Sequence, residues 1–175
     1  MTSTAARVLL VPGRGKPLPG HWSVQWQAQR PDVHWAPEPP GPPYEPDERV
    51  AALDQALRAS DEPAVLVAHS AGCLTVAFWA AQHTGPVRAA LMVTPPFLDR
   101  PEVTWTRLPF RTVVVASRND PNATFEQAAA IGRDWGAELY DAGPVGHLDS
   151  KTGFGPWPAG ERLVDALIKD EAIPG

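Results

Sequence analysis

The sequence predicts an α/β fold, in which a mostly parallel sheet of about five to six strands lies between two layers of helices. Two observations carry this prediction. Short apolar runs rich in β-branched residues recur along the chain, and segments with the apolar spacing of helices lie between them. A continuous apolar run indicates a strand that is covered on both faces. Parallel neighbouring strands need a crossover connection, which the intervening helices supply.

The strands are expected where the apolar runs are continuous. Four runs are clear, at residues 7–11, 64–67, 87–93 and 112–116. Two weaker patterns, at residues 32–35 and 137–141, would complete the sheet. No internal repeat and no linker interrupts this alternation of strands and helices. The whole chain, residues 1–175, is therefore expected to form one domain.

Three segments place their apolar residues on one side, as surface helices do: residues 48–59, 124–135 and 161–169. The second segment has clear end signals, because Thr124 and Gln127 match a capping box and Gly136 follows as a stop. A further stretch, residues 63–87, has no Asp, Glu, Lys or Arg. Because polar residues interrupt it, we interpret it as a buried strand and a buried helix rather than a membrane span.

Composition excludes several classes of function. Hydrophobic residues make up 43% of the chain and charged residues 20%, as in ordinary globular proteins. The formal net charge is −5 and there is no basic block, so no nucleic acid partner is expected. Cys73 is the only cysteine, which excludes an intrachain disulfide and a cysteine-rich metal centre.

The same features suggest where the protein works. A single cysteine suits a reducing compartment, and the N-terminal apolar run is shorter than that of a secretory signal. We therefore expect a cytoplasmic protein with no membrane partner. Cys73 itself is interpreted as a small buried hydrophobic residue rather than a nucleophile.

The residues around Ser70 carry the first chemical signal. An apolar strand leads directly into this serine, and an apolar helix follows, which is the context of a nucleophile elbow. The sharp turn requires small residues two positions before and after the serine, and Ala68 and Gly72 occupy them. The alternative is that Ser70 is only a helix N-cap.

A serine nucleophile needs a histidine and an acid. In proteins with a nucleophile elbow, the acid follows the serine in the sequence and the histidine follows the acid. Asp120 comes after the strand at residues 112–116, and His147 comes after the last expected strand. Both would therefore lie at the same sheet edge as Ser70 if the strands are parallel. Asp149 and Asp99 are the alternative acids, but Asp149 lacks the strand-end position of Asp120.

Several short segments, taken in order, resemble a known family. They are Val11-Pro12-Gly13-Arg14-Gly15, His21-Trp22, Trp26, Ala68-His69-Ser70-Ala71-Gly72, Asn119-Asp120-Pro121 and Gly146-His147. Together they resemble the small serine hydrolases of the YdeN and retinoblastoma-binding-protein-9 family. The resemblance implies a compact three-layer α/β-hydrolase fold without a large cap domain, and a Ser70, Asp120, His147 triad. The sequence departs from the family at Ala68, which replaces a glycine, and in the proline-rich segment 37–46.

The reaction of such a triad needs N–H donors for the oxyanion that forms on the attacked carbonyl. The backbone N–H of Ala71, at the start of the elbow helix, is one candidate. The second is expected from the loop after the first strand, where we favour the N–H of Arg14 and keep that of Gly13 as the alternative. No Lys-Ser/Thr pair follows this loop, so it lacks the P-loop pattern for phosphate.

Aromatic and histidine side chains are expected to line the substrate pocket. The candidates are His21, Trp22, His69, Phe97 and Trp105. Trp26 and Trp157 also lie in segments that could reach the rim of the site, although core packing is the ordinary role of a tryptophan. His69 is more readily explained as a residue that orients the turn or lines the pocket than as a base. His21 could reach the oxyanion region, but a loop residue that hydrogen-bonds the backbone is its simpler role. A mostly apolar pocket predicts small hydrophobic esters as substrates.

The sequence therefore predicts an esterase-like serine hydrolase that acts on a small-molecule acyl substrate through an acyl-enzyme, with no metal or organic cofactor. The alternative is a protein-interaction module that keeps the hydrolase scaffold with little or no turnover. The resemblance leaves a protein partner open, because members of the family have been linked to partner binding.

Overall fold

A six-stranded sheet forms the centre of the computed structural model, which describes residues 6–36, 43–100 and 105–175. Its strands are β1 (Arg7–Val11), β2 (Val33–Trp35), β3 (Ala64–His69), β4 (Val87–Val93), β5 (Arg111–Ala116) and β6 (Glu138–Asp141). Their order across the sheet is β2-β1-β3-β4-β5-β6, and every neighbouring pair is parallel. The predicted sheet is thus confirmed, including its two weaker strands.

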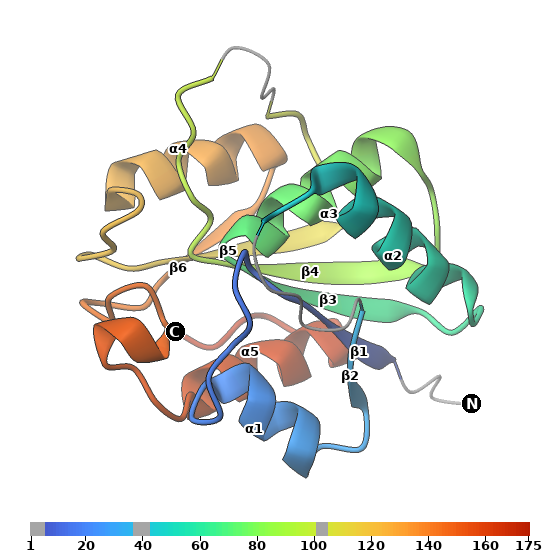
Figure 1. Cartoon of the computed structure of the whole chain (residues 1–175), viewed down its shortest axis with the longest axis horizontal. Helices are drawn as coiled ribbons and strands as arrows, with labels where there is room; N and C mark the ends of the chain where they lie inside the picture. The colour runs from blue at the N-terminus through green and yellow to red at the C-terminus, as the bar shows by residue number, and fades with distance from the viewer. Residues whose placement is uncertain (1–5, 37–42, 101–104) are drawn as a thin grey trace.

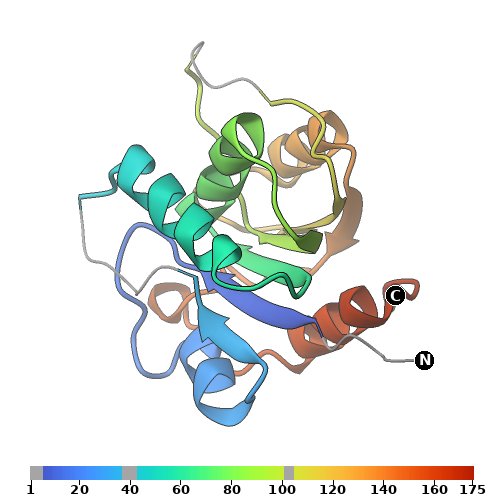
Figure 2. The same ribbon diagram turned by 90° about the vertical axis from the view of Figure 1, so that its right-hand side faces the viewer.

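Helices cover both faces of this sheet. They are α1 (Trp22–Gln29), α2 (Pro46–Arg58), α3 (Ala71–Gln82), α4 (Phe125–Trp135) and α5 (Pro158–Lys169). Figure 1 shows α2, α3 and α4 above the sheet and α1 and α5 below it. The turned view in Figure 2 keeps the same two groups on opposite sides. The three-layer α/β fold predicted from the sequence is therefore the fold of the protein.

The alternation of side chains along each strand explains the continuous apolar runs. In β3, Val65 and Val67 belong to the core under α1 and α5, whereas Leu66 and Ala68 belong to the core under α2, α3 and α4. Successive side chains of a strand point to opposite faces. Both faces of β3 are therefore covered, and a polar residue on either face would be buried.

The helix ends follow from local chemistry. In α4, the Thr124 side chain accepts a hydrogen bond from the Gln127 N–H, the Gln127 side chain accepts one from the Thr124 N–H, and Gly136 closes the helix at φ 71°. This confirms the predicted capping box and stop. By contrast, α2 and α5 begin earlier than predicted, at Pro46 and Pro158. Proline suits the first helical turn because its missing N–H would have no partner there.

The sequence did not reveal α1. His21 is an unusual N-cap, although its ring nitrogen accepts a hydrogen bond from the Ser23 N–H. The buried side chains Trp22 and Trp26 lie one turn apart, and Trp26 stacks on Trp157 with ring centroids 5.8 Å apart. Tertiary packing of these indoles therefore accounts for a helix that had no start signal.

Within the described ranges, no helix combines the length and the apolar character needed to cross a bilayer. The apolar stretch at residues 63–87 forms β3, the elbow and α3, as the sequence predicts. Most of the proline-rich segment, residues 37–42, and residues 101–104 lie outside the described part of the chain.

Candidate active site

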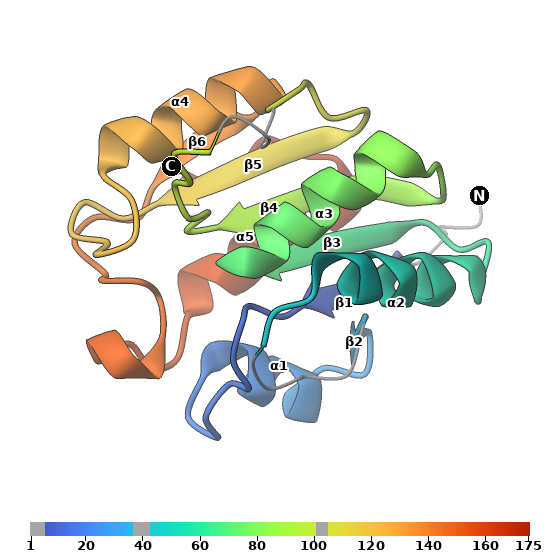
Figure 3. The ribbon, with the colours of Figure 1, turned by 45° about the horizontal axis from the view of Figure 1, so that its top comes forward.

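Three strands of the sheet deliver the candidate site to one edge. Ser70 follows β3, Asp120 lies in the loop after β5, and His147 lies in the loop after β6. Figure 3 shows the arrowheads of β3, β4 and β5 pointing in the same direction. Because the strands are parallel, residues that follow their carboxyl ends meet at one edge even when they are far apart in sequence.

Ser70 occupies a strained turn between β3 and α3. Its backbone has φ 55° and ψ −122°, a combination that side-chain-bearing residues rarely adopt. The Ser70 N–H donates to the carbonyl of Val93 at 2.9 Å, and the N–H of Cys73 donates to the Ser70 carbonyl at 3.0 Å. These bonds hold the turn between a central strand and the first turn of the helix. The geometry is that of the nucleophile elbow the sequence predicts.

Close backbone contact explains the small residues around Ser70. A Cβ atom at Gly72 would lie 2.3 Å from the carbonyl oxygen of Val11 and 2.8 Å from that of Pro12. Only glycine fits at this position without moving the end of β1. Ala68, in contrast, is fully buried and pairs with Val11 and Met92 inside the sheet. The extra methyl group at position 68 is thus accommodated in the core.

The ring of His147 lies between Ser70 and Asp120. Its Nδ1 is 2.9 Å from Oδ1 of Asp120, and its Nε2 is 2.8 Å from Oγ of Ser70. The side chains of His147 and Asp120 are only 6% and 4% exposed. A carboxylate accepts but does not donate, so Nδ1 carries the proton and Nε2 of the neutral ring accepts from the serine hydroxyl. This chain of hydrogen bonds can draw the proton from Ser70.

Neither of the two alternative acids, Asp149 and Asp99, forms a hydrogen bond with the His147 ring in the described part of the chain. The carboxylate of Asp149 accepts hydrogen bonds from the N–H of Thr152 at 2.9 Å and from its hydroxyl at 2.7 Å. It therefore caps the short 3-10 helix Ser150–Thr152. Asp99 is exposed in the loop after β4. Asp120 is the acid that contacts the imidazole.

Hydrogen bonds fix the backbone of His147 on both sides. Its N–H donates to the hydroxyl of Thr152 at 3.0 Å. Its carbonyl accepts from Nε2 of His69 at 2.8 Å and from the hydroxyl of Thr94 at 3.3 Å. Just before it, the N–H of Gly146 donates to the side chain of Asn119 at 2.7 Å. Sequence reasoning missed the supporting roles of Thr94, Asn119 and Thr152, which follow only from the folded loops.

His21 and His69 are neutral side chains. Burial, followed by the influence of nearby imidazoles, lowers the pKa of His69 to about 3. Burial also lowers the pKa of His21 to about 4, although the nearby Asp149 carboxylate opposes that shift. Nδ1 of His21 accepts from the N–H of Ser23 at 3.2 Å, so the proton of the neutral ring is on Nε2. Neither residue contacts the Ser70 hydroxyl as His147 does.

The loop after β1 lies against the elbow. A Cβ atom at Gly13 would come within 3.4 Å of the Ser70 Cβ and 4.0 Å of the Ala71 nitrogen. In the described part of the chain, neither the N–H of Ala71 nor that of Arg14 donates a hydrogen bond to another protein group. The N–H of Gly13, the alternative donor, is likewise without a protein acceptor there, so all three groups remain candidate oxyanion donors.

These groups open into a cleft of about 1110 Å³. Of the predicted pocket residues, four line it: His21, Trp22, His69 and Phe97. Apolar side chains from several loops and α3 join them: Leu18, Leu74, Phe78 and Leu98. Tyr44, from the end of the proline-rich segment, also lines the cleft, and no sequence signal pointed to it.

Trp105 corrects one prediction. It does not line the cleft but packs against Trp135 of α4, with ring centroids 5.3 Å apart in a T-shaped arrangement. Trp26 and Trp157 are likewise core residues, 2% and 4% exposed. An aromatic residue in a loop gives no sequence signal of which side of the loop it faces, and burial against other indoles decided it here.

Cys73 is fully buried, and burial raises the pKa of its thiol above the usual range. Its Sγ lies 3.6 Å from the carbonyl oxygens of Ala68 and Val93. The thiol is thus a packed, protonated group inside α3.

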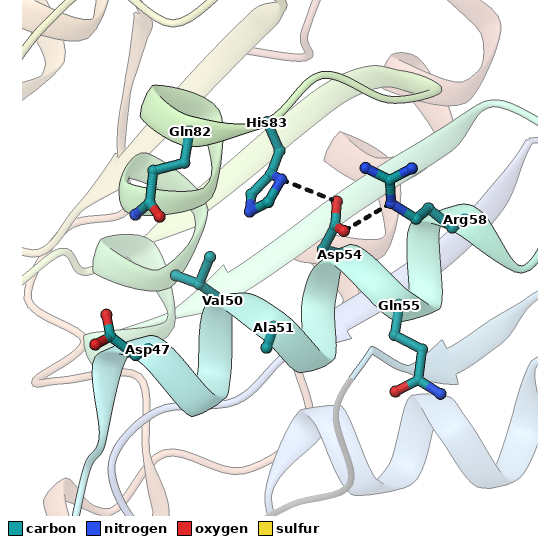
Figure 4. Close-up of a pocket in the computed structure, with 8 residues that line it drawn as sticks. All are labelled: Asp47, Val50, Ala51, Asp54, Gln55, Arg58, Gln82 and His83. Carbon is teal, nitrogen blue, oxygen red and sulfur yellow. Dashed lines mark hydrogen bonds and ion pairs between the residues drawn. The ribbon is translucent and has the colours of Figure 1, made fainter.

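A second, smaller pocket of about 430 Å³ lies on the outer surface between α2 and α3 (Figure 4). Its central carboxylate, Asp54, contacts Arg58 at 2.7 Å, the indole N–H of Trp79 at 3.1 Å and His83 at 3.5 Å. The polar atoms of these side chains are therefore partners of one another, and the contacts of Asp54 with Trp79 and His83 join α2 to α3. The pocket holds none of the residues at the carboxyl edge.

The sheet topology and the placement of these loops define the class of the protein as α/β hydrolase. Within that class, the chain belongs to the serine hydrolase family, whose family model matches residues 8–166. None of the curated proteins matches the chain in sequence.

Solved structures agree with this assignment. A protein from Pectobacterium atrosepticum described as a YdeN-like hydrolase is 26% identical, with 96% of this chain and 93% of that chain covered and a TM-score of 0.88. The ydeN gene product from B. subtilis is 19% identical, with coverages of 94% and 99% and a TM-score of 0.75. An α/β serine hydrolase homologue from Coxiella burnetii is 16% identical, with coverages of 95% and 85% and a TM-score of 0.62. The last two show a shared fold, and together the findings confirm the resemblance to YdeN-like hydrolases.

Proposed function

We propose that this serine hydrolase cleaves small, mostly apolar carboxylic esters through an acyl-enzyme formed on Ser70. The observation that carries the proposal is the ring of His147, which hydrogen-bonds Ser70 on one side and Asp120 on the other. This arrangement turns a weakly nucleophilic alcohol into a group that can attack an acyl carbon.

In the first half of the reaction, Nε2 of His147 takes the proton of Ser70 as Oγ bonds to the ester carbonyl carbon. The carbonyl oxygen becomes an oxyanion, which the N–H groups of Ala71 and Arg14 receive. When the tetrahedral intermediate collapses, the bond to the alcohol breaks and the imidazolium returns the proton to that leaving oxygen. Asp120 keeps the ring in the correct tautomer and stabilises the imidazolium.

In the second half, water attacks the acyl-enzyme, and His147 accepts its proton. Collapse of the second intermediate releases the acid and returns the proton to Ser70. The overall balance is ester plus water giving acid plus alcohol. Each oxyanion donor is expected to lower the barrier by about 3 kcal/mol.

The cleft lining supports an apolar acyl or alkoxy group. Leu18, Phe78, Phe97 and Leu98 offer apolar surface in the cleft that also holds Ser70. Exposed basic side chains stand around the opening: Arg14, Lys16, Arg100 and Lys151. If the substrate carries a charge at its outer end, this rim favours an anion over a cation.

A fluorophosphonate probe tests the proposal. We expect covalent labelling of the wild-type protein, loss of labelling in Ser70→Ala, and retained labelling in Ser23→Ala, a serine of the same cleft that does not contact His147. Hydrolysis of p-nitrophenyl butyrate should follow the same pattern. Folded wild-type protein that neither takes the probe nor hydrolyses the ester would favour the alternative, a binding module on a hydrolase scaffold.

A further inference from the structure

Arg49 is a buried cation that the proposed mechanism does not use. It lies in the first turn of α2, and only 5% of its surface is exposed. A buried charge is costly unless hydrogen bonds compensate for it. The partners of Arg49 therefore indicate what it is for.

Those partners are the backbone carbonyls of the loop after β1. Nη1 donates to the carbonyl of Gly13 at 2.9 Å, the shortest of the three bonds. Nη2 donates to the carbonyl of Arg14 at 3.3 Å, and Nη1 also reaches the carbonyl of Pro12 at 3.4 Å. One guanidinium thus holds three successive peptide groups, which its rigid fork of donors allows.

The geometry of the peptide bond gives this contact a direction. In a planar trans peptide the C=O and the N–H point in opposite directions. The carbonyl of Gly13 and the N–H of Arg14 belong to the same peptide group. By holding that carbonyl on the α2 side of the loop, Arg49 turns the N–H of Arg14 to the other side. The elbow lies against this loop, since a Cβ at Gly13 would approach Ser70 and Ala71.

We propose that Arg49 is a positioning residue of the oxyanion hole, and that it orients the N–H of Arg14, whose peptide group it holds by its shortest hydrogen bond, as the second donor. This inference rests on the proposed serine hydrolase function. The positive charge of Arg49 has a second effect, because a cation bound to the carbonyl polarises the peptide and strengthens the N–H at its other end as a donor. Orientation and polarisation act together on the same group.

Tyr44 extends this support to the first donor. The guanidinium carbon of Arg49 stands 4.8 Å from the centre of the Tyr44 ring. The Tyr44 hydroxyl donates to the carbonyl of Ala71 at 3.2 Å and is 2.7 Å from the hydroxyl of Thr75. The stacked pair therefore contacts both segments that carry the oxyanion donors, the loop after β1 and the first turn of α3.

Substitution of Arg49 tests the inference. We expect Arg49→Met to lower kcat for p-nitrophenyl butyrate by about 10- to 100-fold, with KM changed less than about threefold, because a misaligned N–H is lost mainly in the transition state. Arg58→Met is the matched control: it makes the same substitution on α2, in a side chain that is 69% exposed. It should retain wild-type kcat.

The affinity for a tetrahedral inhibitor distinguishes a positioning role of Arg49 from a merely structural one, because a structural role would leave that affinity unchanged in a folded variant. Phenylboronic acid forms an adduct on an active serine and places an oxygen where the oxyanion would lie. Arg49→Met should weaken its binding by about the same factor as kcat/KM, because both report transition-state stabilisation. Circular dichroism and the thermal midpoint establish that the variant is folded.

The outcomes are distinct. If the wild-type protein is active and Arg49→Met is folded with a kcat within twofold of wild type, the inference about Arg49 is overturned but the proposed function is not. A change in Arg49→Met that is confined to KM would have the same meaning. Inactive wild-type protein would overturn the proposed function together with it. If Arg49→Met does not fold, Arg49→Lys decides: its single ammonium group cannot span the carbonyls as the fork does, so about tenfold lower kcat supports the inference and full kcat overturns it.

Discussion

The ring of His69 donates from Nε2 to the backbone carbonyl of His147 at 2.8 Å. A carbonyl only accepts, so this nitrogen must carry the proton, and the low pKa of His69 keeps the ring neutral. The residue next to the proposed nucleophile therefore holds the backbone of the proposed base. The bond ties the loop after β6 to the end of β3, two segments that the parallel sheet separates by two strands.

Asp120→Asn should lower kcat/KM for a p-nitrophenyl ester by about 10²- to 10⁴-fold, because an amide that donates to Nδ1 leaves the imidazole in the wrong tautomer. Asp149→Asn keeps an acceptor oxygen for Thr152 and should cost less than about tenfold. Steady-state kinetics of both folded variants decide between the acids. A larger loss in Asp149→Asn would contradict the assignment of Asp120.

Gly72→Ala should destabilise the fold by about 1–3 kcal/mol, because the new methyl group would overlap the carbonyl oxygens of Val11 and Pro12. The end of β1 would have to move, and the rate of fluorophosphonate labelling should fall with it. Urea unfolding gives the free energy. Gly20→Ala is the control, since nothing lies within 4 Å of a Cβ there, and an equal loss in both variants would rule out the steric cause.

Stability should decrease as the pH falls from about 6.5 toward 4. The pKa of His21 is about 4 in the folded protein, below its ordinary value of 6.5, so in this range the unfolded chain binds a proton that the folded protein does not. The pKa of His69 is also lowered, to about 3, so His69 likewise decreases stability as the pH falls, and its effect continues below pH 4. The contribution of His21 to the free energy of unfolding is constant above about pH 6.5 and is smaller by about 2–3 kcal/mol at pH 4.5.

Urea unfolding at pH 7.5 and 4.5 measures this effect. In His21→Asn, which keeps a good N-cap side chain for α1, the difference between the two pH values should shrink. His34→Asn changes an exposed histidine of β2 and should leave the difference as in wild type. An unchanged difference in His21→Asn would show that His21 is not the titrating group.

Neutral esters should be hydrolysed with a higher kcat/KM than charged ones, because the accessible side chains of Phe78 and Phe97 line an apolar cleft. Among charged esters, those with a terminal carboxylate should exceed those with a terminal ammonium, since the exposed basic side chains surround the opening. A matched set of butyrate, succinate and 4-aminobutyrate esters tests this order. Equal turnover of all three would contradict it.

Phe97→Ala should change the preference for acyl chain length, because Phe97 is 39% exposed and lines the cleft. Trp105→Ala should instead lower the thermal midpoint and leave chain-length preference unchanged, since its ring packs on Trp135. Turnover of acetate, butyrate and octanoate esters separates the two. A shifted preference in Trp105→Ala would return that residue to the pocket.

Local chemistry is what made much of the fold predictable. The apolar run of β3 is readable because both of its faces are buried, and the ends of α4 are readable because Thr124, Gln127 and Gly136 act within one or two turns. Once the strands are parallel, Ser70, Asp120 and His147 must come to one edge. The bonds of the His147 ring agree with that expectation.

Long-range packing is what the sequence could not reveal. Helix α1 depends on Trp22 and Trp26 meeting Trp157 from the far end of the chain. The one signal for Arg49 was its position a turn before Leu53 on the buried side of α2, where a charge needs partners. Those partners are carbonyls of a loop more than thirty residues away.

The sequence by itself determined the parallel sheet, the sharp turn at Ser70 and the order of the three polar residues, since each depends on neighbours in the chain or on strand direction. The tertiary structure decided which aromatic rings reach the cleft, which acid meets the imidazole and which cation stands behind the loop after β1. These depend on how side chains from separate loops and helices fill one space, and no local pattern encodes that packing.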